Sequence, residues 1–414
     1  MKHLEESVVG LTAIKLINCK SLVSLPTNIW KLKSLESLDL SGCSKFQHFP
    51  EISEAMKHLE FLNLSGTMVK EVPPSIGNLV ALRKLNLAKC NYLEVVHDYL
   101  FPLTSLQELD LSSTKIKSLP ANIKQASQLS RLCLNDCNSL EYLPELPPLL
   151  QCLKANRCTS LKTVSSSSTA LAQGWEKYIF YRGLYEKHKF SNCPKLDENA
   201  RSNILGDAQL RIMRMATASS KFKDDKIEQP SYDSDNDYFE GFLRKRSSVA
   251  IRFCGNEIPN WFSHKSEGCS IKIELPRDWF STDFLGFALS LVFDFATFYM
   301  TVGYVPHDYL TVGCKYNFKT SNGESHEVSH HLYYLRTNDR RRDSHEMFVW
   351  WHDNFFEEVV EGAQSPTAFY KLVTEVNVDF AVMDFINRKR NLVEKCGICL
   401  LYGKDAEMIK QRAL

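Results

Sequence analysis

A leucine pattern repeats at a nearly constant interval through the first part of the chain. The pattern L-x-x-[LI]-x-L begins with Leu11-Thr-Ala-Ile-Lys-Leu16 and recurs to the degenerate copy at Leu150. The first leucines of the copies are Leu11, Leu35, Leu59, Leu82, Leu106, Leu129 and Leu150. Their offsets of 24, 24, 23, 24, 23 and 21 residues match the period of a leucine-rich repeat, which is about 20–29 residues. We therefore expect a horseshoe-shaped solenoid of stacked units, because one unit cannot bury its own apolar face.

Each L-x-L core predicts a short strand on the concave side of this solenoid. Its two leucines, such as Leu38 and Leu40, point inward, and the residues beside them point outward because strand side chains alternate between faces. The outward positions are then Ala13, Lys15, Ser37, Asp39, Phe61, Asn63, Lys84, Asn86, Glu108, Asp110, Arg131, Asn135, Lys154 and Asn156. Phe61 is an aromatic residue on a polar sheet, where contact with a partner or with neighbouring side chains would remove it from water.

The segments after the strands also follow a rule. A small residue stands three positions after the last inward residue of each strand, and we expect it to pack under a turn. These residues are Cys19, Cys43, Thr67, Cys90, Thr114, Cys137 and Cys158. An L-x-x-L-P pattern follows, for example at 22–26 and 116–120. Proline ends strand pairing, which predicts a convex side with few long helices.

The two ends of the array differ. Residues 1–10 contain no obvious capping segment, so we expect a fragment or truncated product whose upstream repeats are missing. At the other end, Phe190, Cys193 and Leu196 indicate a terminal unit after an insertion at 165–187. A helix over 197–215 and a polar stretch over 217–247 follow, the latter a solvated loop or an ionic partner site.

From Val249 onward the sequence alternates apolar and polar residues in short runs. The predicted strands cover 249–253, 270–275, 284–295, 312–318, 347–351, 370–380 and 396–402. Short strands separated by turn residues suggest a β-sandwich or jelly roll. The expected protein is therefore β-rich and multidomain. It has leucine-rich repeats over 1–164, a terminal repeat-like cap with a helix and polar linker over 165–247, and a β-sandwich over 248–405.

Composition excludes other classes of protein. Lys and Arg number 50 against 49 acidic residues, so the net charge of +1 argues against nucleic acid or an anionic membrane as the main partner. The cysteine count of 13 is odd and no secretory signal opens the chain, which favours free thiols in a reducing compartment. The longest apolar stretch, 284–300, is short for a membrane span and contains Asp294, so we expect a buried strand there.

Two short motifs could carry chemistry. His326-Glu-Val-Ser-His330 matches H-E-x-x-H, which on a helix places two histidines and a glutamate around zinc. The segment reads as a strand, where the histidines would lie about 13 Å apart, too far for joint ligation. A zinc-dependent hydrolase using His326, Glu327 and His330 is the alternative function, against a chance match. Cys396-Gly-Ile-Cys399 is a single C-x-x-C pair, for which we expect packing in the last strand.

Two longer strings of residues are more specific. One is Leu35-Glu-Ser-Leu-Asp-Leu-Ser-Gly-Cys43, and the other is Phe253-Cys-Gly-Asn-Glu-Ile-Pro-Asn-Trp-Phe-Ser-His264. With Glu394-Lys-Cys-Gly-Ile-Cys-Leu-Leu-Tyr402 near the end, they resemble the C-terminal half of plant TIR-type nucleotide-binding leucine-rich-repeat (TIR-NBS-LRR) disease-resistance receptors. The post-repeat region looks like the jelly-roll/Ig-like C-JID domain of that family. The resemblance covers nearly the whole chain.

The resemblance implies that both domains recognise a pathogen effector protein in defence response and signal transduction. It implies a cytoplasmic location, with the nucleus as a second one. In a full receptor the partners would include its own nucleotide-binding and TIR domains and sister protomers. The family's TIR domain cleaves NAD, but this sequence departs from the family by lacking that domain and a G-x-x-x-x-G-K-[ST] phosphate loop. We therefore expect no enzymatic activity, cofactor, metal, nucleic acid or membrane span.

The predicted function is protein recognition without catalysis. The candidate partner-binding residues are Lys15, Ser37, Asp39, Phe61, Asn63, Lys84, Asn86, Glu108, Asp110, Arg131 and Lys154. In the β domain, loops 297–311 and 336–346 are the expected contact segments. A truncated receptor that acts as an adaptor or decoy is a further alternative.

Overall fold

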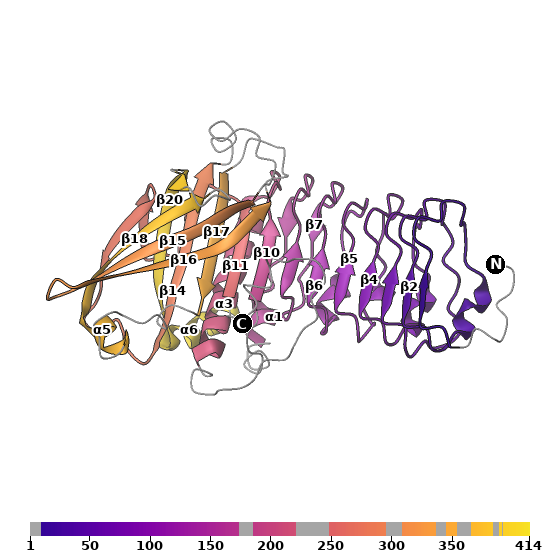
Figure 1. Cartoon of the computed structure of the whole chain (residues 1–414), viewed down its shortest axis with the longest axis horizontal. Helices are drawn as coiled ribbons and strands as arrows, with labels where there is room; N and C mark the ends of the chain where they lie inside the picture. The colour runs from indigo at the N-terminus through magenta and orange to yellow at the C-terminus, as the bar shows by residue number, and fades with distance from the viewer. Residues whose placement is uncertain are drawn as a thin grey trace. The chain divides into compact units, whose positions relative to one another are not determined.

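The computed structural model describes residues 10–173, 185–220, 248–294, 309–336, 345–353, 366–383, 389–390 and 392–414. The chain divides into two compact bodies. The repeat body comprises Met1–Gly174 and Lys187–Asp207, and the sandwich body comprises Trp175–Glu186 and Ala208–Leu414. A leucine-rich-repeat array followed by a β domain confirms the predicted fold class (Figure 1). Within the described residues, no helix has both the length and the apolar character of a membrane span.

The repeat body is built on one parallel sheet, with a short strand from each repeat. Its strands are β1 (Ala13–Lys15), β2 (Ser37–Asp39), β3 (Phe61–Asn63), β4 (Lys84–Asn86), β5 (Glu108–Asp110), β6 (Arg131–Cys133), β8 (Cys152–Lys154) and β10 (Tyr185–Phe190). Neighbouring strands pair without a register shift. The middle residue of each interior strand, such as Leu38 or Leu62, is fully buried. The leucine period therefore fixes the register, because a slip by one residue would expose this apolar set.

A left-handed residue follows every strand at the same place. These residues are Asn18, Gly42, Gly66, Lys89, Ser113, Asp136, Arg157 and Asn192, with φ between 55° and 72°. The turn that they form aims a backbone N–H at the next repeat, as in the 2.7 Å bond from Gly42 N to Ser65 O. A Cβ on Gly42 would lie 2.1 Å from Asn18 Oδ1, so a larger residue at this position would have to displace the Asn18 side chain.

The small residue after this turn forms a ladder that crosses the repeats. The Cys43 thiol donates to Leu16 O of the preceding repeat at 2.9 Å, and the Cys137 thiol donates to Leu111 O at 3.1 Å. Thr67 instead bonds within its own repeat, to Leu64 O at 2.7 Å. Cys19 is exposed, whereas the later ladder cysteines are buried. Packing under the turn, as the sequence predicts, is confirmed for the later cysteines.

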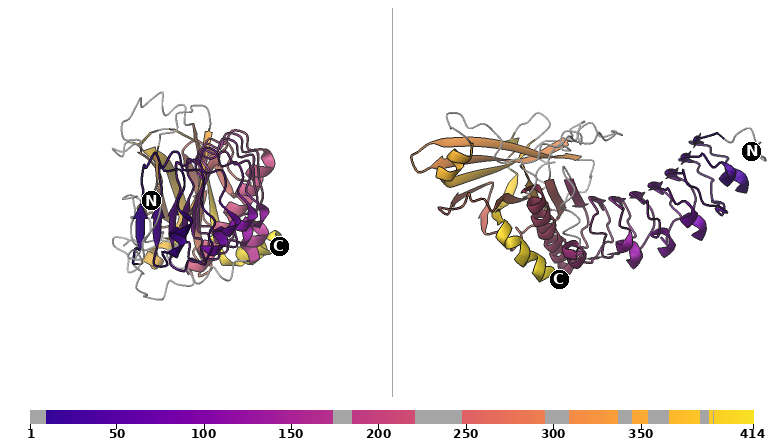
Figure 2. Two further views of the ribbon diagram at one scale, coloured as in Figure 1. Left: turned by 90° about the vertical axis from the view of Figure 1, so that its right-hand side faces the viewer. Right: turned by 90° about the horizontal axis from the view of Figure 1, so that it is seen from below.

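The convex side carries short 3₁₀ turns in place of α-helices, as the prolines predict. They are η2 (Thr27–Lys31), η3 (Pro74–Asn78), η4 (Asp98–Leu100) and η5 (Ala121–Gln125). Pro26, Pro73 and Pro120 precede three of them in extended conformation. In the right-hand view of Figure 2 these turns lie along one side of the array and the strands along the other. Two-residue strands β7 (Tyr142–Leu143) and β9 (Thr163–Val164) pair with each other in a separate parallel sheet.

The last repeat is formed by β10 and the turn after it. β10 pairs with β8, and the Cys193 thiol donates to Ala155 O at 3.1 Å, as the ladder cysteines do. The sequence places an insertion up to residue 187, but the strand already begins at Tyr185. Helix α1 (Ser168–Gln173) lies before it. Helix α3 (Glu198–Ser220) follows, and Asp197 Oδ1 caps it by accepting from Ala200 N at 2.7 Å.

The sandwich body contains two antiparallel sheets. The first has the order β11 (Ser248–Cys254), β17 (His345–His352), β14 (Phe284–Asp294), β20 (Val393–Tyr402) and β12 (His264–Glu267). The second has the order β13 (Ser270–Glu274), β18 (Val373–Met383), β15 (Tyr309–Thr320) and β16 (Ser325–Arg336), with β19 (Lys389–Arg390) beside β18. Every segment that the sequence predicts as a strand in this body overlaps a strand of the structure. Tyr370 is an exception in detail, because it lies in helix α5 (Pro366–Leu372) before β18.

Two of the specific sequence strings pack against each other in this body. A Cβ on Gly397 of β20 would lie 2.6 Å from Ile258 Cγ2 and 3.2 Å from Phe262, so the 253–264 segment sits directly on the strand backbone. Lys395 Nζ pairs with Glu257 Oε1 at 2.6 Å beside this contact. Pro259 is buried and Trp261 is half-buried against Phe262. The string N-E-I-P-x-W-F therefore shapes the domain. The final helix α6 (Gly403–Ala413), which the sequence did not predict, is capped by Asp283.

Buried ion pairs brace the helix α3 end of the sandwich body. Glu186 accepts from Arg211 Nη1 at 2.7 Å and from Arg214 Nη2 at 2.8 Å, and all three side chains are almost fully buried. Arg252 Nε and Glu346 Oε2 form a second buried pair at 2.9 Å. The first pair joins helix α3 to Glu186 and the second joins β11 to β17. Removal of one partner from either pair would leave an uncompensated buried charge.

We predict that equivalent leucines differ in their contribution to stability. Leu59 is 0% exposed and Leu11, its counterpart in the first repeat, is 38% exposed. Leu59→Ala should lower the free energy of unfolding by about 3 kcal/mol through lost burial and a cavity, and Leu11→Ala by less than about 1 kcal/mol. Urea unfolding followed by circular dichroism measures both. Equal losses would contradict the assignment of Leu59 as an interior stacking residue.

Candidate protein-recognition surface

The concave sheet of the repeat body presents its outward side chains in two rows that cross the strands. The first row contains Ala13, Ser37, Phe61, Lys84, Glu108, Arg131, Cys152 and Lys187. The second row contains Lys15, Asp39, Asn63, Asn86, Asp110, Cys133, Lys154 and Lys189. Buried middle residues such as Leu85 separate the rows. All eleven candidate residues from the sequence fall in these two rows.

The prediction that two asparagines are outward strand residues is wrong. Asn135 and Asn156 lie in the turns after β6 and β8, and the outward positions of those strands are Cys133 and Cys152. Both cysteines are nearly buried, at 9% and 4% exposure. Alternation from the inward leucine identifies Cys133 correctly.

The second row also has a structural role. Oδ1 of Asp39, Asn63, Asn86 and Asp110 accepts a hydrogen bond from the backbone N–H two residues later, at 2.8–3.0 Å. Such side-chain bonds hold the turn that leads into the left-handed residue. These four side chains therefore present only part of their hydrogen-bonding capacity to a partner.

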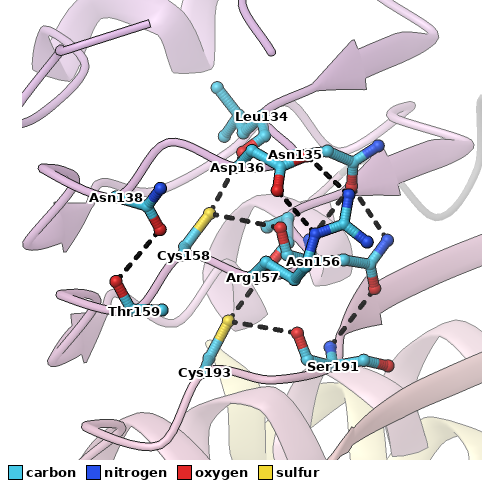
Figure 3. A network of polar contacts seen from close by, with 11 residues as sticks. Leu134, Asn135, Asp136, Asn138, Asn156, Arg157, Cys158, Thr159, Ser191 and Cys193 are labelled. Atoms are coloured by element: carbon cyan, nitrogen blue, oxygen red, sulfur yellow. Dashed lines mark hydrogen bonds and ion pairs between the residues drawn. The ribbon is translucent and has the colours of Figure 1, made fainter. Parts of the chain in front are cut away.

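The turns after β6 and β8 use a different network, which Figure 3 shows. Asn156 donates to Asn135 Oδ1 through its backbone N at 3.1 Å and its Nδ2 at 2.8 Å. Ser191 N donates in turn to Asn156 Oδ1 at 3.3 Å. Beside it, Arg157 holds Asp136 in a two-pronged ion pair at 2.5 and 2.6 Å. Asn135 and Asn156 thus connect consecutive repeats.

A third row, which we call the edge row, borders the concave sheet, and the leucine pattern did not predict it as a surface row. It contains the residues just before the strands: Thr12, Glu36, Glu60, Arg83, Gln107, Ser130 and Gln151. Their backbones form a continuous ladder, for example from Glu60 N to Glu36 O at 2.8 Å. Glu36, Glu60 and Arg83 are exposed. Simple alternation places this position inward, but the two residues between the leucines of L-x-x-L both stay outside.

Several charges on this surface pair with neighbours. Glu108 Oε1 lies 3.4 Å from Lys84 Nζ and 3.9 Å from Arg131 Nε, and Glu60 Oε2 lies 3.8 Å from Arg83 Nε. The side chains of these pairs are between one-third and about half exposed, so each pair contributes little to stability. The charges at the centre of the surface are therefore largely paired within the chain.

The Cys133 thiol is unsuited to nucleophilic chemistry. Burial, with smaller contributions from Asp110 and Cys152, raises the pKa of Cys133 to about 12. Only the thiolate is a strong nucleophile, and at neutral pH this group stays protonated. Within the concave face it acts as a small apolar contact.

The H-E-x-x-H segment lies in strand β16, where it pairs with β15. Val328 is buried between the two histidines, and Glu327 Oε2 pairs with Lys315 Nζ at 2.6 Å. The helical arrangement that zinc hydrolysis needs is therefore not formed. Among the residues that the structure describes, no group of three or more His, Cys, Asp or Glu side chains is arranged to hold a metal.

The remaining candidate sites have simple explanations. Burial raises the pKa of Cys396 to about 12, and the Cys399 thiol donates to Trp261 O at 3.6 Å, so the C-x-x-C pair serves packing. Of the two expected contact loops, 297–308 and 337–344 lie outside the described residues.

Comparisons with known proteins match both bodies. Residues 253–407 match the C-JID domain, and residues 31–106 match the leucine-rich repeats of disease resistance proteins like RPS4B. The Arabidopsis thaliana disease resistance-like protein DSC1 is 30% identical over 97% of this chain and 34% of its own length. RPS4B from the same plant is 30% identical over 71% of this chain and 21% of its own length. The chain thus spans about a third or less of the length of these relatives.

Solved structures also resemble part of the chain. The leucine-rich-repeat protein LIC12759 of Leptospira interrogans covers 46% of this chain and 50% of its own, with 24% identity and a TM-score of 0.32. The leucine-rich-repeat domain of the type III effector XopL covers 47% of this chain and 77% of its own, with 22% identity and a TM-score of 0.35.

We predict that the side-chain oxygen of Asn63 stabilises the turn after β3, and that replacing its amide by a carboxylate preserves this effect. Asn63→Ala should lower the free energy of unfolding by about 1 kcal/mol, because the Ser65 N–H loses its acceptor. Asn63→Asp keeps the oxygen and should stay within about 0.5 kcal/mol of the parent. Thermal unfolding of both variants measures this. Equal losses would show that the bond does not stabilise the turn.

We predict that stability falls as the pH rises above about 9. Burial raises the pKa of Cys133, Cys314 and Cys396 to about 12, while unfolded thiols ionise near 8.5. Above that pH the unfolded chain binds fewer protons, so each thiol should cost about 1–2 kcal/mol of stability by pH 10. Urea unfolding at pH 7 and pH 10 measures the loss. Cys133→Ala should show a smaller pH dependence than the parent, and an unchanged dependence would contradict the burial argument.

Proposed function

Given that this chain combines the leucine-rich repeats and the C-JID domain of plant disease-resistance receptors, we propose that it is a non-catalytic recognition module of an intracellular immune receptor. Its concave sheet binds a pathogen effector protein and so contributes to defence signalling. The observation that carries this proposal is the surface itself. Two concave rows and the edge row bring polar and charged side chains from eight repeats onto one face, and few of them are needed for the core.

Phe61 is the best candidate for an anchor of this contact. It stands in the first row on β3, between Ser37 and Lys84, and it is half-buried by its own chain. An aromatic ring with polar neighbours gains from a partner that covers it, and aromatic residues dominate the energetics of many interfaces. The surrounding polar residues would exclude water and set the orientation.

The β domain supports this role as a second contact region. In a complete receptor the chain would also meet its own nucleotide-binding and TIR domains and sister protomers. Its place of action would be the cytoplasm, with the nucleus as a second location. As a separate polypeptide the same surface would act as an adaptor or decoy, since binding needs none of the signalling domains.

We predict that effector binding depends on the concave face. Phe61→Ala should weaken binding of a recognised effector by about 2 kcal/mol, roughly 30-fold, through loss of the anchor. Asp39→Asn should weaken it less, because it removes the charge and keeps the oxygen that accepts from Ser41 N. Surface plasmon resonance against a panel of purified effector proteins measures both variants.

Val80→Ala is the matched control, because Val80 is 46% exposed and lies outside the three rows. It should leave binding unchanged, and circular dichroism should be the same for all variants. If an effector binds parent, Phe61→Ala and Asp39→Asn equally well, the concave face is not its site and the contact belongs to the β domain.

A further inference from the structure

The four turn acceptors of the second row present a fixed pattern of hydrogen-bonding atoms. Each bonds through its side-chain Oδ1 to the backbone N–H two residues later, and the four are Asp39, Asn63, Asn86 and Asp110. This bond fixes the orientation of both amides, because a backbone N–H can bond only to the side-chain oxygen. The remaining atom is therefore the Nδ2 donor in each asparagine and the Oδ2 acceptor in each aspartate.

These remaining atoms are open to a partner. All four side chains are half-buried on the outward face of the sheet. Within the part of the chain that the structure describes, the two Nδ2 atoms and the two Oδ2 atoms make no hydrogen bond or ion pair. Along β2, β3, β4 and β5 the second row therefore offers an acceptor, a donor, a donor and an acceptor.

This pattern does not depend on the net charge of the region. Lys15 stands opposite Asp39 on β1, and Arg83 and Lys84 come shortly before Asn86. These cations offset the neighbouring carboxylates, so this part of the concave face is neither strongly acidic nor strongly basic. Hydrogen bonding instead depends on which atom faces the partner. A partner that sets donor against donor, or acceptor against acceptor, leaves polar atoms unsatisfied and binds more weakly.

The spacing of the pattern favours a helix as the partner element. Neighbouring strands lie about 4.8 Å apart, so the three steps from β2 to β5 span about 14 Å. Three turns of a helix advance about 16 Å. In an extended chain, residues on one side are about 6.7 Å apart and advance about 20 Å over three such steps. A helix that lies across the strands therefore keeps one turn close to each strand.

We propose that the second row of β2–β5 binds an α-helix of a partner protein, laid across the strands. The helix presents N–H donors such as lysine over Asp39 and Asp110, and amide oxygens such as those of glutamine over Asn63 and Asn86. Side chains at i, i+4, i+7 and i+11 lie on one face of a helix and provide these four contacts. The inference rests on the proposed function and adds to it the element and the polarity of the partner.

Two peptides of equal composition test the pattern. The first, SAEAKAAAQAAQAAAKAAAA, carries Lys, Gln, Gln and Lys at these four spacings, and the second, SAEAQAAAKAAKAAAQAAAA, exchanges Lys and Gln. Alanine gives both a high helix propensity, and circular dichroism checks that their helix contents are equal. The protein should bind the fluorescein-labelled first peptide about fivefold more tightly than the second, as measured by fluorescence anisotropy at low salt.

An isosteric swap in the protein provides the matched comparison. The variant combines Asp39→Asn, Asn63→Asp, Asn86→Asp and Asp110→Asn. It keeps the net charge, the neighbouring cations and all four turn oxygens, so its thermal unfolding should stay close to that of the parent. Because the pattern is reversed, the second peptide should now bind about fivefold more tightly than the first. Asn91→Asp, at an exposed position outside the three rows, should keep the parent's preference.

Three results would overturn the proposal. They are no binding of either peptide, equal binding of both peptides by the parent, and the same preference in the parent and the swapped variant. If the swapped variant does not fold, Asn63→Asp alone serves in its place. That variant should reduce the preference of the parent for the first peptide to about twofold or less, and an unchanged preference would again contradict the proposal.

These outcomes are separable from those of the proposed function. An effector whose binding is lost in Phe61→Ala supports recognition by this face even if the peptides show no preference. A preference that the swap reverses, without any effector that depends on Phe61, would keep the hydrogen-bonding pattern and remove the effector proposal.

Discussion

The lateral bonding of one repeat to the next is the interaction on which the repeat body depends. A single repeat offers a strand of three residues and one row of leucines, which cannot form a core alone. Each turn solves this by placing a left-handed residue whose N–H reaches a carbonyl of the following repeat, as Gly42 reaches Ser65. The ladder cysteines add bonds in the opposite direction, as from Cys43 to Leu16 O. The turn, the strand and the ladder bond of each repeat therefore depend on one another.

This architecture separates stability from recognition only in part. First-row residues such as Phe61 and Lys84 make no bond that the sheet needs, so they can vary without loss of the fold. Second-row residues such as Asp39 and Asn63 also hold their own turns. The second-row positions are therefore limited to residues whose side chain can accept this hydrogen bond, and a partner that contacts this row would meet only such residues. Most variation in specificity should then fall on the first row and the edge row.

The sandwich body shows the same dependence of specific residues on close contact. Gly397 lets the 253–264 segment approach the backbone of β20, and Ile258 and Phe262 fill the space that a side chain would take. Two of the three strings that resemble the disease-resistance family, 253–264 and 394–402, thus form two sides of one contact. The distinctive sequence of these two strings therefore reflects packing within the domain.

The sequence by itself determined the elements whose period is local. The leucine spacing predicted the inward positions of the seven copies from Leu11 to Leu150 and most of their outward positions, since register in a sheet follows from which face is buried. The prolines predicted a convex side with few long helices, and alternation predicted most sandwich strands. Alternation did not predict the edge row, because two consecutive residues point outward there.

Tertiary structure decided what depends on residues distant in sequence. The pairing of β10 with β8 brings Lys189 next to Lys154 across an insertion, and no local pattern encodes that neighbour. Packing between neighbouring strands also buries most of the Cys133 side chain, although this residue points to the concave face. The H-E-x-x-H motif lies in strand β16, which pairs with β15. A strand rises about 3.3 Å per residue where a helix rises 1.5 Å, so the same spacing that gathers zinc ligands on a helix separates them here.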